Sequence, residues 1–318
     1  MRRREVVAGV VALIARPDAA PAQQLVQRVG VLFPAGDTPG SQDLVQALRK
    51  LGYLEGRNIS YDIRAADGEP ERLPLLARQI IAGKPDVIVS ATSAAARALT
   101  DATREIPIVL AIISDPVALG VTQSIARPTG NVTGFTTGHD TVAAKRLELL
   151  HEMVPTARKV ALLWVLANSQ HQLLVDLIRQ AALPLHVELL SFAVTHAEDI
   201  PPALAKAVEL GAAALLVAAD PLTVRNRRII IDECLLLDLP AMHGYSFEVR
   251  DGALMSYGGD AGENYAHTAA YVDRLLKGAR IAELPFQEPT QIRLAINLRT
   301  ARSMRLTVPP RSSPAPTR

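Results

Sequence analysis

Two aspartates follow apolar runs at equivalent points of the two halves of the chain. Residues 109–113 lead to Asp115-Pro116, and residues 215–218 lead to Asp220-Pro221. Such runs are typical of strands buried on both faces of a parallel sheet, and the proline that follows can begin a helix. Ligands of open parallel sheets bind at the carboxyl ends of the strands. The carboxylates of Asp115 and Asp220 could therefore bind an ammonium group or hydroxyls across a shared cleft, or simply cap the next helix.

Hydroxyl and amide side chains stand at two further strand ends. Thr92 and Ser93 follow the strand predicted at 86–90, and Asn168 follows the strand predicted at 159–164. Each group opens a helix, where free N–H groups and the helix dipole attract an anion such as a carboxylate. Plain helix capping is the alternative for each residue.

Two tyrosines, Tyr245 and Tyr257, follow the last apolar segments of the second half. Either ring could stack on a planar group of a ligand, although a tyrosine in the core or at its rim needs no ligand. The segment 244–248 resembles the turn that carries a nucleophilic serine in hydrolases. Its last position is Glu248, however, where that turn requires glycine.

Known signatures of catalysis and of cofactor binding are absent from the sequence. It contains no phosphate-binding loop and no dinucleotide fingerprint, its seven histidines are scattered, and its one cysteine excludes a zinc site built from paired cysteines. Cys234 lies in a long apolar stretch and is expected to be a buried, inert thiol. We therefore predict no catalytic residue, no metal and no cofactor.

The elements that position these groups alternate between strand and helix. Strands are expected near 28–33, 58–64, 86–90, 109–113, 159–164, 186–192, 212–218, 240–243, 253–257 and 291–297, with helices near 41–52, 73–81, 197–210, 222–237 and 261–277. Because 58–64 alternates apolar and polar residues, it is expected at a sheet edge. Repeated β-α-β units predict an α/β protein whose parallel sheets are covered by helices on both faces.

The N-terminus has the features of an export signal. Three arginines at 2–4 precede ten apolar residues at 6–15, and Ala20-Pro21-Ala22 resembles a cleavage site. Without residues 1–22 the chain has 30 basic and 30 acidic side chains, so nothing predicts a nucleic-acid partner. We expect an exported protein cleaved near Ala22, with no membrane insertion of the mature chain.

Seven ordered motifs resemble one protein family. They are 52–58 (GYLEGRN), 114–120 (SDPVALG), 127–134 (RPTGNVTG), 143–150 (AAKRLELL), 219–221 (ADP), 252–258 (GALMSYG) and 297–301 (NLRTA). Together they resemble the substrate-binding proteins of ABC transporters of the tryptophan/tyrosine type, over about residues 28–310. The resemblance implies a periplasmic-binding-protein-like fold of type I: two Rossmann-like lobes with parallel sheets, joined by a hinge of several crossovers. It also implies capture of a small ligand in the cleft and docking to a membrane permease.

The residues and the resemblance together give the expected segments and site, and all site residues except Tyr245 are also implied by the resemblance. The expected segments are an export signal at 1–22, a first lobe at 28–137 plus 260–308, a second lobe at 138–259 and a disordered tail at 309–318. The expected ligand-binding residues are Thr92, Ser93, Asp115, Pro116, Asn168, Asp220, Pro221, Tyr245 and Tyr257. This sequence departs from the family by having Val165-Leu166 where relatives have Asn-Pro.

These observations support one main hypothesis and two alternatives. The main hypothesis is a monomeric, periplasmic solute-binding protein that closes on an amino-acid-like or other polar ligand for an ABC importer. One alternative is a doubly wound hydrolase or isomerase that uses Asp115 or Asp220 as acid or base. The other is a sensor that binds a ligand without transport.

Overall fold

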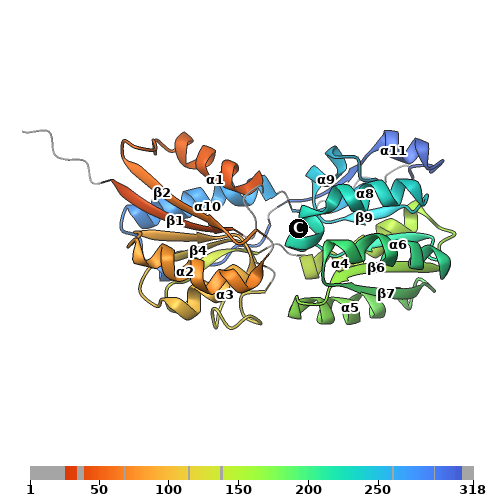
Figure 1. The fold of residues 1–318 in the computed structure, drawn as a ribbon, viewed down its shortest axis with the longest axis horizontal. Coiled ribbons are helices and arrows are strands. Elements are labelled where there is room, and N and C mark those ends of the chain that lie inside the picture. The colour runs from red at the N-terminus through yellow and green to blue at the C-terminus, as the bar shows by residue number, and fades with distance from the viewer. Residues whose placement is uncertain are drawn as a thin grey trace, which may run out of the picture.

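The computed structural model describes residues 26–33, 39–67, 69–113, 115–136, 139–259, 261–289 and 291–309. They form two lobes that lie side by side, each built on a central sheet covered by helices (Figure 1). The predicted export signal and nearly all of the predicted tail lie outside the described residues. Within the described part of the chain, no helix is both long enough and apolar enough to span a bilayer.

The first lobe contains a five-stranded sheet in the order β2-β1-β3-β4-β5, with every pair parallel. The strands are β1 (Gln27–Phe33), β2 (Ile59–Ala65), β3 (Val87–Ser90), β4 (Ile108–Ile113) and β5 (Val132–Thr136). The inner strands β3 and β4 consist almost entirely of buried residues, as expected for a sheet covered on both faces. The prediction that 58–64 forms an edge strand is confirmed by β2.

Helices cover both faces of this first sheet. They are α1 (Pro39–Lys50), α2 (Leu73–Ala82), α3 (Ser93–Ala102) and α10 (Ala261–Leu276), with short turns of 3-10 helix at η1 (Pro70–Arg72) and η3 (Ile281–Glu283). One face packs against α1 and α10 through Leu44, Leu48 and Val272. The other face packs against α2 and α3 through Ile80 and Leu99.

The second lobe contains a six-stranded sheet in the order β11-β10-β9-β8-β6-β7. Its strands are β6 (Lys159–Val165), β7 (Glu188–Val194), β8 (Ala214–Val217), β9 (Ala241–His243), β10 (Met255–Gly259) and β11 (Ile292–Ile296). The assignment of residues 291–308 to the first lobe is wrong, because β11 pairs antiparallel with β10 from Met255↔Ile296 to Gly259↔Ile292, and Ala301 and Met304 lie in the core of the second lobe. A partly exposed strand of this kind suits an edge, where an antiparallel partner is common in otherwise parallel sheets.

Helices also cover both faces of the second sheet. They are α4 (His139–Met153), α5 (Ser169–Ala182), α6 (Ile200–Glu209) after η2 (Ala197–Asp199), α7 (Pro221–Arg225), α8 (Arg227–Leu236), α9 (Ser246–Arg250) and α11 (Leu298–Ser303). The predicted helix 222–237 is two helices that break at Asn226, whose amide donates to the Leu222 carbonyl at 2.9 Å. The short helix α9 was not predicted.

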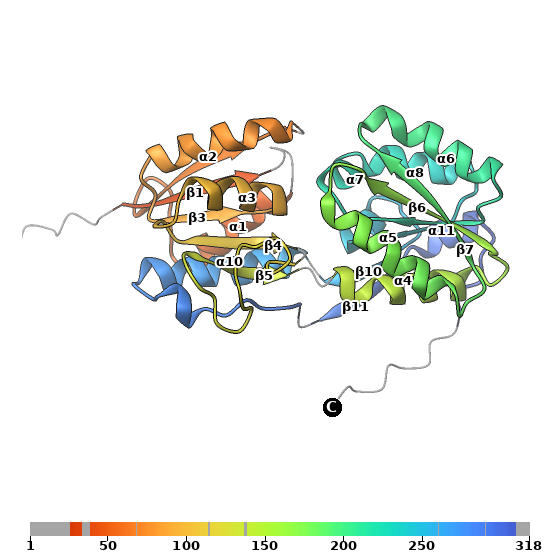
Figure 2. The same cartoon turned by 90° about the horizontal axis from the view of Figure 1, so that it is seen from below.

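The chain passes between the lobes three times: from β5 to α4, from β10 to α10, and from η3 to β11. Consequently α10 lies in the first lobe although β10 and β11 lie in the second (Figure 2). On the first-lobe side, the Thr136 amide donates to the Gln287 carbonyl at 2.8 Å, which joins the first and third passages. On the second-lobe side, the β10–β11 pairing joins the second and third passages. The segments that connect the lobes are therefore tied to one another at both ends.

Candidate functional site

At the carboxyl edge of the second sheet, two predicted site residues are hydrogen bonded to each other. Asn168 precedes α5 and Asp220 precedes α7, and the Asn168 amide Nδ2 donates to Asp220 Oδ2 at 2.9 Å. Each residue also caps its own helix: Asn168 Oδ1 accepts from the Gln170 amide at 3.1 Å, and Asp220 Oδ1 accepts from the Leu222 amide at 2.8 Å. Capping and the contact between the loops therefore occur together, and they fix this carboxylate in position. Pro221 begins α7 beside it and is exposed.

A buried histidine lies beside this pair. His171 is 5% exposed, and its Nδ1 accepts from the Val165 backbone amide at 3.0 Å. Nε2 then carries the ring proton and lies 3.3 Å from the Asn168 amide nitrogen. Because both groups are donors in this arrangement, the ring packs beside Asn168 without a hydrogen bond to it. Sequence reasoning missed His171, whose only signal was its position three residues after a predicted cap.

At the carboxyl edge of the first sheet, the predicted residues make local contacts. Thr92 Oγ1 accepts from the Ala95 amide at 3.2 Å and caps α3. Asp115 Oδ1 accepts from the amides of Val117 and Ala118 at 2.8 and 3.0 Å, so it closes its own turn. Asp115 is half-buried, and the Pro116 that follows it is buried. Thr92 and Asp115 are therefore held by their own loops.

A hydrogen bond between side chains joins the two edges. Ser93 Oγ at the start of α3 donates to Gln170 Oε1 at the start of α5, with an oxygen–oxygen distance of 3.4 Å. Ser93 follows the carboxyl end of β3 and Gln170 follows that of β6. The carboxyl ends of the two sheets therefore face each other at this point. Gln170 was not among the predicted site residues.

Tyr245, at the end of β9, lies at the same boundary between the lobes. Its ring stacks on Phe247 with centroids 5.2 Å apart and an interplanar angle of 13°. Burial raises the pKa of Tyr245 well above its usual value; the Glu248 carboxylate adds to the rise, the Arg146 guanidinium opposes it, and Asp220 adds a smaller rise. Burial likewise raises the pKa of Tyr265 on α10 of the first lobe, and Tyr245 contributes to that rise from the second lobe. The loop after β9 therefore approaches α10.

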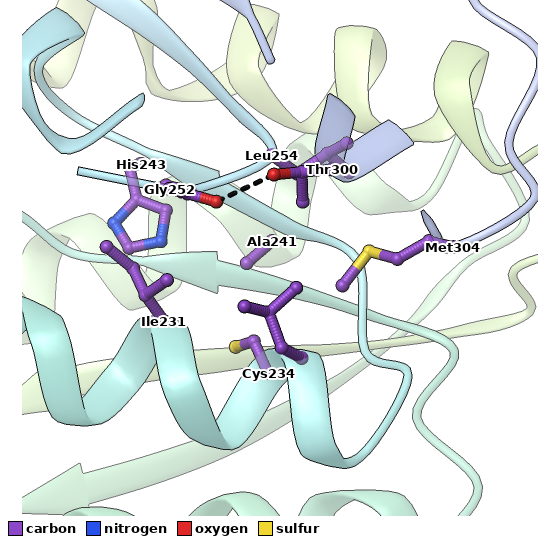
Figure 3. A pocket seen from close by; sticks show the side chains of 10 residues that line it. Ile231, Cys234, Ala241, His243, Gly252, Leu254, Thr300 and Met304 are labelled. Carbon is purple, nitrogen blue, oxygen red and sulfur yellow. Dashed lines mark hydrogen bonds between the residues drawn. The ribbon is translucent and has the colours of Figure 1, made fainter. Parts of the chain in front are cut away.

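A buried pair of side chains anchors the backbone of Tyr245. Glu248, 2% exposed, accepts from the Tyr245 amide at 2.9 Å, and its other oxygen lies 3.2 Å from Nδ1 of His243, which is fully buried. Behind this pair is a small cavity, lined in part by His243 and by Thr300, whose hydroxyl donates to the Gly252 carbonyl (Figure 3). The sequence indicated only that Glu248 stands where a nucleophile turn requires glycine, and its role in anchoring Tyr245 was not predicted.

Tyr257 lies on β10, and its ring packs partly against the core of the second lobe. Its backbone carbonyl accepts from Nε of Arg146 at 2.6 Å. Arg146 comes from the inner face of α4 and is 5% exposed. Stacking of the Tyr257 ring on a ligand remains a prediction, and the buried cation beside its carbonyl was not predicted.

Two small cavities between described residues are too small for an organic ligand. One lies behind His243 and the other beneath Arg146, and each has a volume of about 10 Å³, enough for one water molecule. Among the residues that the structure describes, no group of three His, Cys, Asp or Glu side chains is arranged to hold a metal ion. Cys234 is buried as expected, and burial raises the pKa of its thiol to about 12.

Comparisons with known proteins agree with this architecture. A family model described as ABC transporter substrate binding protein matches residues 38–317. The tyrosine-binding protein of Clostridioides difficile (strain R20291) is 24% identical over 260 residues, which cover 82% of this chain and 74% of that protein.

Two solved structures share the fold. A conserved domain protein from Vibrio cholerae has a TM-score of 0.82 at 25% identity, and an ABC domain in complex with L-Trp from Streptococcus pneumonia has a TM-score of 0.80 at 21% identity. In both cases the similarity covers 89% of this chain and 96% of the other. Since the family model spans most of the sequence, this chain belongs to the family of ABC transporter substrate-binding proteins.

Proposed function

We propose that this protein is an extracytoplasmic receptor of an ABC importer that captures a small amino-acid-like ligand between its lobes. The observation that carries the proposal is the contact between Ser93 and Gln170, which brings the carboxyl edges of the two sheets face to face. Ligands of open parallel sheets bind at such edges. The protein acts as a monomer, docks on a membrane permease and catalyses no reaction.

The ligand groups follow from the residues at the edges. The N-termini of α3 and α5, beside Thr92 and Asn168, attract the carboxylate of the ligand. The Asp220 carboxylate accepts from the Asn168 side chain and from the Leu222 and Thr223 backbone amides, and a carboxylate has about four acceptor positions, so one is left for an ammonium group. Asp115 offers a second acceptor from the first lobe. An amino acid carries both charges, and the tyrosine-binding and L-Trp-bound relatives support this class of ligand.

Tyr245 contributes an aromatic surface to the same site. One face of its ring lies on Phe247, and that ring is in turn covered by the Arg227 guanidinium at 5.6 Å. Because aromatic rings favour stacked or tilted partners, a ligand with a planar side chain gains contact area here. L-tyrosine and L-tryptophan are therefore the first compounds to test.

Binding and closure are thermodynamically coupled. The ligand shifts the protein toward the closed arrangement only by its preference for that arrangement. Contacts from both lobes, such as Asp115 from one and Asp220 from the other, supply this preference because both are made only when the edges meet. Three passages of chain between the lobes permit a rigid-body motion of this kind.

A thermal-shift screen over the twenty L-amino acids tests the proposal. A true ligand at a hundred times its Kd stabilises the protein by about 2.7 kcal/mol. For that ligand, we expect Asp220→Asn to weaken binding at least about tenfold, because the carboxylate loses its charge-assisted contact with the ammonium group. The control is Asp101→Asn, which changes an exposed carboxylate at the far end of α3 and leaves binding unchanged. Well-folded protein that responds to no amino acid would rule out this ligand class.

A further inference from the structure

Arg146 lies buried where three segments of the second lobe meet. It projects from the inner face of α4, is 5% exposed, and donates from Nε to the Tyr257 carbonyl at 2.6 Å. A buried charge is expensive unless hydrogen bonds compensate for it, and a bond from a guanidinium to a carbonyl is stronger than a neutral one. The contact therefore holds the end of β10 firmly against α4.

The backbone beside this contact has no room to move. A Cβ on Gly258 would lie 2.4 Å from the Gly244 carbonyl oxygen and 3.0 Å from Nη2 of Arg146. A Cβ on Gly259 would lie 3.0 Å from Pro289. The end of β10 is thus packed between α4, the loop after β9 and the segment before β11, and only glycine fits at Gly258 without displacing them.

This packing lies directly at the passages between the lobes. The chain leaves the second lobe after Gly259, and α4 is the first element after the chain enters it from β5. Arg146 therefore joins the first passage to the second, while the pairing of Gly259 with Ile292 joins the second to the third. The Arg146 contact is made by a charged side chain, whereas the Thr136–Gln287 and Gly259–Ile292 contacts are made by backbone.

We propose that Arg146 is a positioning residue for ligand capture: by holding the Tyr257 carbonyl, it sets the direction in which β10 leaves for the first lobe and so the relative orientation of the lobes. The inference rests on the proposed function, because the orientation matters only if both lobes contact one ligand. Apparent affinity falls with the fraction of molecules in the binding-competent arrangement. A looser end of β10 lowers that fraction.

The test compares Arg146→Gln with Lys145→Gln. Lys145 is the matched control, since it lies next to Arg146 on α4, loses the same charge, and is an exposed residue paired with Glu148. Circular dichroism checks folding, small-angle scattering of ligand-free protein measures the lobe arrangement, and calorimetry with L-tyrosine and L-tryptophan measures affinity. For Arg146→Gln we expect a changed radius of gyration and an affinity at least about tenfold weaker, as the loss of a charge-assisted hydrogen bond implies. The control stays within about twofold of wild type.

Gly258→Ala attacks the same contact without removing the charge. Its Cβ must displace the Gly244 carbonyl at 2.4 Å and also presses on the Arg146 guanidinium at 3.0 Å, so the scattering and affinity should change in the same direction as in Arg146→Gln. If Arg146→Gln fails to fold, this variant tests whether the contact between Arg146 and β10 sets the orientation of the lobes.

Failure of the proposed function and failure of the role of Arg146 give different results. If wild type binds no amino acid, the proposed function fails, and the scattering of ligand-free variants still tests Arg146. If folded Arg146→Gln and Gly258→Ala both match wild type in scattering and affinity, Arg146 is a packing residue only and the inference is overturned.

Discussion

The carboxyl edges of the two sheets carry similar residues but are held in different ways. In the second lobe, Asp220 is hydrogen bonded to Asn168 on a neighbouring loop, and the buried His171 packs beside that asparagine. In the first lobe, Asp115 closes its own turn and Thr92 caps its own helix. Similar residues at the strand ends are thus hydrogen bonded between neighbouring loops in the second lobe, and only within their own loops in the first. Below, the carboxyl edge of each sheet with these residues is called its rim. We expect the second lobe to offer a preformed half-site to which the first lobe adjusts.

The two cores also depend differently on distant parts of the chain. The first lobe needs α10, a helix that follows most of the second lobe in sequence, to cover one face of its sheet. The second lobe receives only an edge strand and a short helix, β11 and α11, after the chain has returned. The first core is therefore the more sensitive to loss of its late segment.

The largest expected effect comes from removing the contact between β5 and α10. Phe135 is 2% exposed and packs on Tyr271 with ring centroids 4.7 Å apart. Phe135→Ala should cost about 3–5 kcal/mol of unfolding free energy, because it leaves a cavity under this helix. Urea unfolding measures the loss, with Leu173→Ala, at a position 67% exposed, as a control expected to stay within about 0.5 kcal/mol. A loss below about 1 kcal/mol would show that α10 is not the anchor of the first lobe.

A smaller effect on stability is expected from removing the aspartate at each rim, and its size should differ between the two lobes. Asp220→Ala loses a helix cap and the hydrogen bond from Asn168, so it should cost about 2 kcal/mol. Asp115→Ala loses only its local turn contacts and should cost about 1 kcal/mol. Calorimetric unfolding of both variants measures the difference. Equal losses would mean that the bond between the loops adds nothing to the second rim.

Alkaline pH should weaken the first lobe through its tyrosines. Burial is the main cause that raises the pKa values of Tyr53 and Tyr61 to about 12, and the Asp273 carboxylate, which accepts from the Tyr53 hydroxyl at 2.9 Å, adds to the rise for Tyr53. A folded pKa above the ordinary value of about 10 means that the fold favours the neutral phenol. This stabilisation is complete below about pH 10 and is lost as the pH rises to about 12.

Tyrosinate absorbance of the native protein, compared with Tyr53→Phe, measures this titration. We expect the variant to lose less stability than wild type between the two pH values. Native tyrosines that all titrate near their ordinary pKa would contradict the burial assigned to these rings.

The smallest expected effect is on the reactivity of Cys234, which reports on the second lobe alone. It is the only cysteine of the chain, is 3% exposed, and has a pKa raised to about 12 by burial. Because the thiol is buried and its pKa is raised, it stays protonated and inaccessible at about pH 8, so Ellman's reagent should react only after the lobe opens. In Phe135→Ala, labelling that stays slow while the first lobe unfolds would show independent lobes. Rapid labelling of fully native protein would contradict the burial of the thiol.

Much of the fold could be predicted because its signals are local. Buried parallel strands appear as continuous apolar runs, and helix starts such as Thr92 and Asn168 are marked by capping residues. The location of β11 could not be predicted, since a short, partly exposed strand fits an edge of either sheet and its partner is chosen by tertiary packing. The helix α9 was missed because five residues are too few to show a period.

The site was predictable only in part, for a related physical reason. Position at a strand end identifies Asp115 and Asp220, but nothing local reveals that Asn168 reaches across to Asp220. Gln170 and Arg146 were missed because their contacts lie 77 and 111 residues away in sequence. Pairings of this length depend on the lobes being assembled, and a single sequence contains no signal for them.

The most direct test of the account measures the distance between the two facing edges. Spin labels at positions 94 and 173, both exposed and on α3 and α5, report this distance, while buried Cys234 stays unlabelled. Pulsed electron resonance is recorded without ligand and with the amino acid that gives the largest thermal shift. We predict a single, shorter distance in the presence of the ligand. A distance distribution unchanged by a ligand that demonstrably binds would contradict capture by closure of the two lobes.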